Sequence, residues 1–150
     1  MKFVGLDPSL TGTGIVKLDL ESNIEEQKLI STKSSDKEEY RMSFILNEVN
    51  RIIDNDSVVY IEGLSHGSTG QSILEMAGLH YCITVNLYQR KITFKDIPPG
   101  TLKKFVTGNG RGKKNLMLLK TYKKFGIEFE DDNLCDAFCL AKLALEEHKK

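Results

Sequence analysis

The chain has 150 residues, of which 40% are hydrophobic and 28% charged, and its formal net charge at pH 7 is zero. This length predicts one domain, residues 1–150, with enough apolar residues for a substantial core. No apolar run approaches the roughly 20 residues of a membrane-spanning helix, and the start MKFVGLD has no signal peptide. We therefore exclude a membrane protein and expect a cytoplasmic one.

The first half of the chain is predicted to contain four strands and one helix. Residues 2–7 indicate a buried strand, and residues 13–19 indicate its hairpin partner across a Gly-rich turn. Residues 24–32 predict a third strand. Apolar residues then recur at helical spacing and predict an amphipathic helix over about 36–55, before a further buried strand at 57–62.

The second half is predicted to be mainly helical. A long helix is expected at about 71–87, followed by a short strand at 92–94. A helix at 101–107, which a preceding proline can open, leads to a basic helix at 113–125. The last helix follows an acidic run and ends near residue 147.

This order of elements predicts an α/β fold. Three successive strands favour an antiparallel start, and strands separated by helices favour parallel additions. We therefore expect a mixed five-stranded sheet, antiparallel in its first three strands, with helices on both faces.

Basic residues are concentrated in one segment although the whole chain is neutral. From Gln89 to Lys124 there are eleven lysines or arginines and one acid, Asp96. Such a segregated basic segment is typical of a surface that binds a polyanion. The alternative is an ordinary solvated surface.

The three cysteines are Cys82, Cys135 and Cys139. They include no C-x-x-C pair, so the sequence does not favour a zinc site. We expect buried, reduced thiols.

Acidic residues close two of the predicted strands. Asp7 ends the first and Glu62 ends the fourth, and ligands in open α/β sheets bind at the carboxyl ends of strands. At the start of the last helix, Asp132, Asn133 and Asp136 stand at positions i, i+1 and i+4. Asp136 can therefore face the sheet with either of the other two beside it.

Such a cluster of carboxylates predicts a metal site, because the charges repel one another unless cations separate them. Oxygen ligands suit Mg²⁺ or Mn²⁺, and two ions about 3.5–4 Å apart can activate water and stabilise the leaving oxygen in phosphodiester cleavage. Each acid also has a structural alternative. Asp7 could accept turn N–H groups, Glu62 could pair with a lysine, and Asp132 could cap the last helix.

Three motifs resemble those of the RuvC-type Holliday junction resolvases. GLDPSLTGTGIV is similar to the first motif of that family, VVYIEGL to the second and DDNLCDAFCLA to the last. The resemblance covers most of the chain and implies an RNase H-like fold. It also implies Asp7, Glu62 and Asp136 as catalytic metal ligands.

The stretch TLKKFVTGNGRGKK resembles the basic DNA-binding stretch of the same family. By position, Lys103 and Lys114 match the lysines that approach the scissile phosphate, and Lys114 is therefore expected to be catalytic. The compact form PPGTLKKFVTGNG resembles the bacteriophage branch; for a phage-encoded protein the expected cytoplasm is that of the host. Other basic residues are expected to follow the DNA backbone: Lys104, Arg111, Lys113, Lys120, Lys123 and Lys124.

The sequence departs from the family in two places. Asn133 occupies a position that is normally Asp or His, and Asp132 lies one residue earlier. Either side chain can supply an oxygen ligand to a metal ion, and we favour Asp132 as the fourth ligand of the metal site. Residues 63–68, which follow the second motif, contain no aromatic wedge; His66 could stack on a base or lie on the surface.

The combined pattern predicts a structure-selective DNA endonuclease that acts on Holliday junctions or other branched DNA. The expected reaction is in-line attack by metal-activated water, which leaves 5′-phosphate and 3′-hydroxyl ends, with Mg²⁺ as cofactor and Mn²⁺ as a substitute. Because resolving a four-way junction takes two matched cuts, the resemblance implies a twofold homodimer. The main dimer element of the family is the helix at 71–87. It carries more apolar surface than one sheet face needs, although core burial accounts for much of it: Ile73, Leu74, Ala77, Leu79 and Tyr81.

Two other functions remain open from the sequence. The first is a small-molecule phosphotransferase, because DPSLTGTG also resembles the first phosphate loop of actin-like ATPases and sugar kinases. We find no second phosphate loop, however, and expect no nucleotide cofactor. A protein of the same fold that binds branched DNA without cleaving it is the other alternative, and Asn133 is the feature that favours it.

Overall fold

The protein is described by a computed structural model covering residues 1–64, 70–111 and 114–150. Its strands form one five-stranded sheet in the order β3-β2-β1-β4-β5. β1 pairs antiparallel with β2, and β2 with β3, whereas β4 is parallel to β1 and β5 to β4. This arrangement confirms the predicted mixed sheet. The bounds are Lys2–Asp7 for β1, Thr13–Leu18 for β2, Ile24–Ile30 for β3, Ser57–Glu62 for β4 and Thr93–Ile97 for β5.

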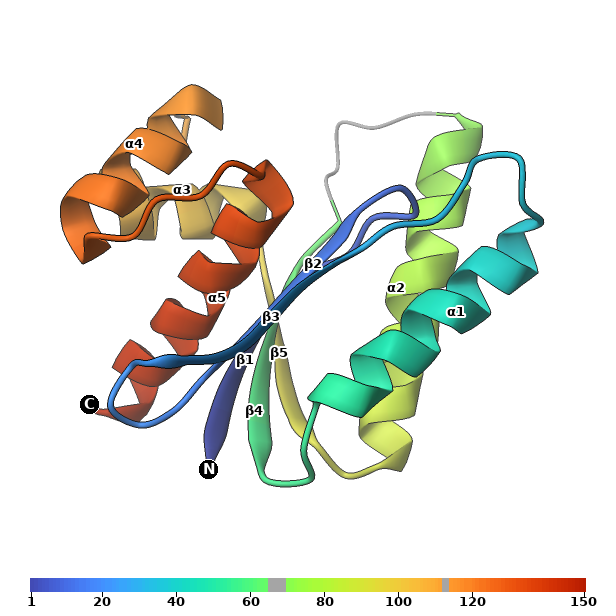
Figure 1. Ribbon diagram of the computed structural model, residues 1–150, viewed down its shortest axis with the longest axis horizontal. Helices are drawn as coiled ribbons and strands as arrows, with labels where there is room; N and C mark the ends of the chain where they lie inside the picture. The colour runs from blue at the N-terminus through green and yellow to red at the C-terminus, as the bar shows by residue number, and fades with distance from the viewer. Residues whose placement is uncertain (65–69, 112–113) are drawn as a thin grey trace.

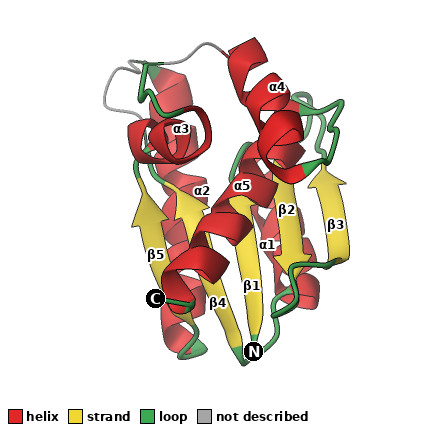
Figure 2. Cartoon of the chain, turned by 90° about the vertical axis from the view of Figure 1, so that its left-hand side faces the viewer, coloured by secondary structure: helices red, strands yellow, loops and turns green. Residues whose placement is uncertain are grey.

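Helices cover both faces of the sheet (Figures 1 and 2). On one side lie α1 (Glu38–Ile52) and α2 (Gln71–Gln89). On the other lie α3 (Pro99–Thr107), α4 (Lys114–Phe125) and α5 (Asp132–His148), with α5 directly against the strands. Among the described helices, none is both long enough and apolar enough to span a membrane.

Several elements differ in extent from their prediction: α1 and β3 are shorter than predicted, whereas β5 and α3 are longer. β5 runs from Thr93 to Ile97 rather than over 92–94, because its pairing with β4 continues past the apolar residues. Lys95 and Asp96 are exposed on this edge strand. Their polar side chains interrupt the apolar run, so the sequence pattern did not predict that the strand continues through them. α3 begins at Pro99, since the Pro98 carbonyl already accepts from the N–H groups of the first helical turn.

The core has two layers, one on each face of the sheet. Phe3, at the start of β1, packs with the side chains of α5. Val4 and Leu6 point the other way and pack with α1 and α2. Because side chains alternate along a strand, Gly5 and Asp7 share the α5 face with Phe3.

Helix α5 lies unusually close to β1 because Gly5 has no side chain. A Cβ atom there would lie 1.8 Å from the carbonyl oxygen of Ala137 and 2.6 Å from the backbone nitrogen of Ala141. This contact fixes the height of α5 above the strand, and therefore the position of every α5 side chain that faces the sheet.

Candidate metal centre

Strand pairing brings the first two acids to one end of the sheet. β1 and β4 run parallel with Gly5 opposite Tyr60 and Leu6 opposite Ile61, so Asp7 and Glu62 come next on each strand. Glu62 also shares the α5 face, since Tyr60 packs in the α5 layer and side chains alternate. Both carboxylates therefore meet α5 at the carboxyl ends of adjacent strands.

The start of α5 places the third acid. Asp131 is the N-cap, and its side chain accepts a hydrogen bond from the backbone N–H of Leu134 at 2.9 Å. The structural alternative that made Asp132 the cap is therefore wrong. The cap is one residue earlier, Asp132 is the first helical residue, and Asp136 lies one turn further on.

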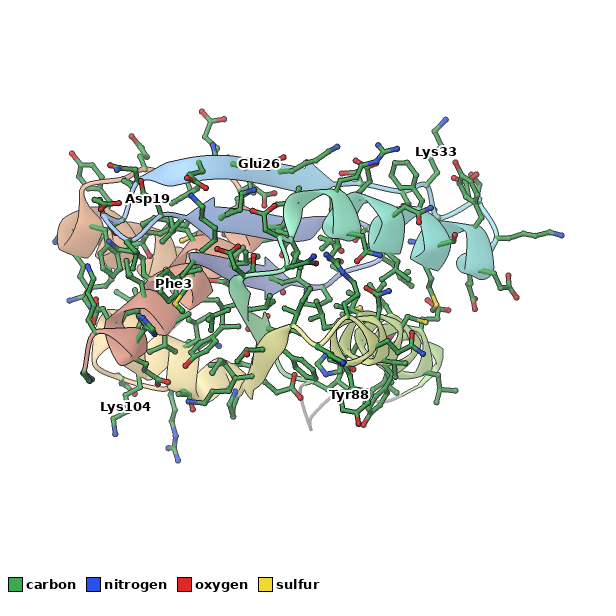
Figure 3. All side chains as sticks on the ribbon, turned by 90° about the horizontal axis from the view of Figure 1, so that it is seen from below. Phe3, Asp19, Glu26, Lys33, Tyr88 and Lys104 are labelled. Carbon is green, nitrogen blue, oxygen red and sulfur yellow. The ribbon has the colours of Figure 1, made fainter. Side chains whose placement is uncertain are left out.

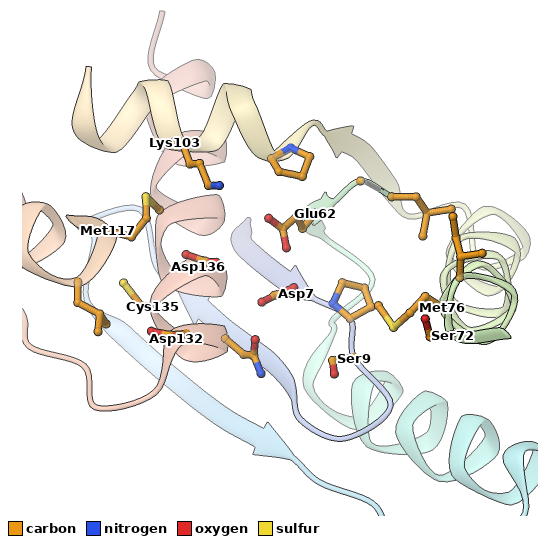
Figure 4. Close-up of a pocket in the computed structure, with 17 residues that line it drawn as sticks. Asp7, Ser9, Glu62, Ser72, Met76, Lys103, Met117, Asp132, Cys135 and Asp136 are labelled. Atoms are coloured by element: carbon orange, nitrogen blue, oxygen red, sulfur yellow. The ribbon is translucent and has the colours of Figure 1, made fainter. Parts of the chain in front are cut away.

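Asp7, Glu62 and Asp136 converge (Figure 4). One carboxylate oxygen from each lies within 4.8 Å of the other two, which is the one such group of acids, histidines or cysteines among residues 1–64, 70–111 and 114–150. Asp7 is 6% exposed, and the other two are half-buried. Three carboxylates this close suit a hard divalent cation, so the donor set fits Mg²⁺ or Mn²⁺.

The three carboxylates line a cavity of ≈ 410 Å³. Lys103 reaches into it from α3, toward the acids (Figure 4). The opposite wall is apolar and includes Pro8 and Met76. The cavity thus combines anionic ligands, a cation and an apolar wall.

Asp132 and Asn133 both line the cavity, but in different ways. Asp132 lies outside the group of three carboxylates. Asn133 points its amide nitrogen at the β1–β2 turn and donates to the carbonyl of Gly12 at 2.7 Å. The sequence identified Asn133 as a ligand candidate. It did not predict this hydrogen bond, because Asn133 and Gly12 are 121 positions apart in the chain.

The predicted basic surface is described in part. Lys104 and Arg111 are exposed, and Lys104 projects from α3 away from the sheet (Figure 3). Lys114 begins α4, but its side chain, like Lys113 and His66 as a whole, lies outside the described residues.

Lys124, expected to contact DNA, is exposed and also makes contacts within the protein. Its Nζ donates to the carbonyl of Phe105 at 2.8 Å and lies 3.8 Å from the centroid of the Phe105 ring. Lys124 thus joins α4 to α3.

Cys135 and Cys139 are buried in α5, and Cys135 also lines the cavity. Cys139 Sγ lies 3.1 Å from Thr121 Oγ1, and Cys135 Sγ donates to the same oxygen at 3.4 Å. The hydrogen bond to Cys135, together with burial, raises the pKa of the Cys139 thiol, so it stays protonated. The expectation of a buried thiol is wrong for Cys82, which is exposed on α2.

The face of α2 that points away from the sheet is largely apolar. Leu74, Tyr81, Val85 and Tyr88 are 66%, 62%, 51% and 77% exposed. Their spacing of seven, four and three residues places them along one side of the helix. Sequence reasoning included Leu74 and Tyr81 among the apolar residues of this helix and missed the other two. Leu79 is fully buried in the core, as the alternative of core burial allowed.

Known proteins match the chain over nearly its whole length. The family model described as "Crossover junction endodeoxyribonuclease RuvC" matches residues 3–143. A protein of that name from Prochlorococcus marinus (strain NATL1A) is 30% identical over 153 aligned positions, which cover 94% of this chain and 96% of the relative.

Two solved structures also align with nearly the whole chain. Thermus thermophilus RuvC in complex with Holliday junction substrate aligns with a TM-score of 0.77 at 13% identity, covering 99% of this chain and 96% of that one. The fowlpox virus Holliday junction resolvase aligns with a TM-score of 0.63 at 12% identity, covering 98% and 99%. These alignments confirm the RNase H-like fold that the motifs implied.

Proposed function

The chain belongs to the RuvC family of crossover junction endodeoxyribonucleases, and we propose that it resolves Holliday junctions, and other branched DNA, by hydrolysing phosphodiester bonds to 5′-phosphate and 3′-hydroxyl ends. One observation carries the proposal. Asp7, Glu62 and Asp136 are the acids of the three family-like motifs, and their oxygens converge within 4.8 Å.

In this proposal the carboxylates hold two Mg²⁺ ions, for which Mn²⁺ can substitute. Asp7, Glu62 and Asp136 are the core ligands, and Asp132 is the fourth, since it lines the same cavity. When bound, such ions lower the pKa of water, polarise the phosphate and stabilise the leaving oxygen. The protein's part is to hold the carboxylates rigidly on two strand ends and one helix.

Basic side chains position the DNA. Lys103, which reaches into the cavity, neutralises charge on the scissile phosphate, and we assign Lys114 the same role from the family motif. Lys104, Arg111 and Lys113 contact the backbone on either side. Phosphate contacts of this kind give affinity and register without reading the base sequence.

The test is cleavage of a synthetic four-way junction with each strand labelled in turn, in Mg²⁺ and in Mn²⁺. The matched substrate is a linear duplex that contains the sequence of one pair of arms. We expect paired nicks on opposite strands of the junction and none on the duplex. Tight junction binding with no cut in either metal would overturn the proposal and leave a branched-DNA-binding protein.

Binding to the junction is expected to weaken steeply with salt. The five proposed contacts, Lys103, Lys104, Arg111, Lys113 and Lys114, predict a slope of about −4.5 for log K against log salt per protomer, because neutralised phosphates release counterions. Lys104→Gln should reduce that slope by about one, as fluorescence anisotropy would measure. A slope that is flat, or that Lys104→Gln leaves unchanged, contradicts the assignment of this surface to DNA.

We also propose a homodimer that forms through the exposed apolar face of α2. An apolar stripe of this kind on a soluble protein marks an interaction surface. Two copies related by a twofold axis would present two metal centres for two matched cuts. Tyr88, the most exposed of its residues, projects from α2 at the molecular surface (Figure 3).

Charge placed on this α2 face should separate the dimer. Tyr81→Lys is expected to raise the dissociation constant of the dimer by about 30-fold or more, the effect of a central interface residue. Sedimentation equilibrium measures it. The control is Leu20→Lys, which changes an exposed apolar residue in the β2–β3 turn and should have no effect. A Tyr81→Lys chain as dimeric as wild type rules out this interface.

A further inference from the structure

Hydrogen bonds from two threonine side chains, Thr13 and Thr32, fix the turn between β1 and β2. Within the turn, Thr13 Oγ1 donates to the carbonyl of Ser9 at 2.7 Å and accepts from its backbone N–H at 3.0 Å. Thr32 Oγ1, just after β3, donates to the carbonyl of Leu10. These bonds give the residues that follow Asp7 a fixed shape.

Asn133 holds the same turn from the opposite side, where α5 lies. Its Nδ2 donates to the Gly12 carbonyl at 2.7 Å, and a Cβ atom on Gly12 would lie only 3.2 Å from that nitrogen. Two residues further along, a Cβ atom on Gly14 would lie 2.2 Å from the backbone oxygen of Asn133. The first turn of α5 is therefore seated directly on the hairpin.

This contact lies between two of the proposed metal ligands. Gly14 is the cross-strand partner of Asp7. Asp136 is three residues beyond Asn133 and so lies on the same side of α5. A change in the bond from Asn133 to Gly12 therefore changes the separation of the Asp7 and Asp136 carboxylates.

We propose that Asn133 is a positioning residue, which joins the β1–β2 turn to α5 and holds Asp7 and Asp136 at the spacing that a shared cation requires. The inference rests on the proposed metal-dependent function. The role needs a donor, since the Gly12 carbonyl can only accept. A carboxylate at position 133 accepts only when ionised, so it would lose the bond and repel the carbonyl.

The experiment compares Mn²⁺ binding, measured by calorimetry and by electron paramagnetic resonance of the bound ion, in wild type and Asn133→Asp. We expect Asn133→Asp to bind Mn²⁺ about 10- to 100-fold more weakly, with a similar loss in the rate of junction cleavage. If Asn133 is instead a ligand, the added charge strengthens Mn²⁺ binding and cleavage persists, which overturns the proposal.

A second variant perturbs the same bond without changing Asn133. Gly12→Ala is compatible with the local backbone, since Gly12 does not adopt a left-handed conformation. Its methyl group would lie 3.2 Å from Asn133 Nδ2, so we expect the amide to shift by a few tenths of an ångström. Gly12→Ala should weaken Mn²⁺ binding, and combining it with Asn133→Ala should add nothing beyond Asn133→Ala alone. Additive losses in the double variant contradict coupling through this bond.

The matched control is Asn23→Ala. Asn23 Nδ2 donates to Asp19 at 2.8 Å in the β2–β3 turn at the far end of the sheet, so its loss should leave Mn²⁺ affinity unchanged. An equal loss in the control would reduce the role of Asn133 to general stability and overturn the proposal. Because Mn²⁺ binding needs no DNA, a wild-type chain that binds Mn²⁺ but cuts no junction refutes the proposed function alone.

Discussion

Asp7→Asn is expected to abolish junction cleavage while leaving junction binding within about threefold of wild type, a difference of less than 1 kcal/mol. Asn keeps the size of Asp and one oxygen but removes the charge that attracts the cation. A bound metal ion contributes several kcal/mol to the transition state, so the loss in rate should be about 10³-fold or more. Binding should persist because the proposed basic contacts come from the segment from α3 to the start of α4, and Asp7→Asn leaves all of them in place.

The measurement is single-turnover cleavage of the labelled junction in Mg²⁺, with binding followed by anisotropy. Asp56→Asn is the matched control, since Asp56 pairs with the chain's amino terminus just before β4, at the opposite end of the sheet from Glu62. Cleavage at the wild-type rate by Asp7→Asn excludes Asp7 from the metal centre. A parallel loss of binding would show that Asp7 supports the structure rather than the chemistry.

Gly5→Ala is expected to cost more stability than alanine at any other glycine within residues 1–64, 70–111 and 114–150. The added Cβ would lie 1.8 Å from the Ala137 oxygen, and backbone atoms cannot rotate out of its way. Overpacking of this kind costs about 1–3 kcal/mol where side chains can adjust, so we expect a decrease of about 3 kcal/mol or more in the free energy of unfolding. Cleavage should fall as well, because α5 carries Asp136.

Urea unfolding followed by circular dichroism measures the decrease. Gly100→Ala is the control, because a Cβ there would meet nothing closer than 3.9 Å, and alanine in a helix should be neutral or stabilising by up to about 1 kcal/mol. Equal stability of Gly5→Ala and wild type would contradict the close contact between α5 and β1.

The sheet and the three acids could be predicted because local patterns specify them. Apolar runs identify β1 and β4, and a carboxylate at the end of each run shows which edge of the sheet carries chemistry. Helical spacing then brings Asp136 to that edge. The motif resemblance removed most of the remaining choice among the many acids.

The details that failed depend on contacts between distant parts of the chain. Three successive acids, Glu130, Asp131 and Asp132, span the start of α5, and the sequence alone does not show which one caps the helix. The hydrogen bond from Asn133 to Gly12 can form because Gly5 and Gly14 have no side chains, which lets α5 pack directly against β1 and β2. Helix α2 is apolar on most sides, so spacing alone did not separate Leu79, in the core, from the exposed Val85 and Tyr88.

The central claim is that Asp7, Glu62 and Asp136 form a metal centre, and anomalous diffraction from a Mn²⁺-soaked crystal tests it most directly. We predict manganese peaks in the cavity between the three carboxylates, with oxygens of all three residues about 2.0–2.2 Å from the metal. Manganese bound elsewhere on the protein, with no peak at these carboxylates, would contradict the claim.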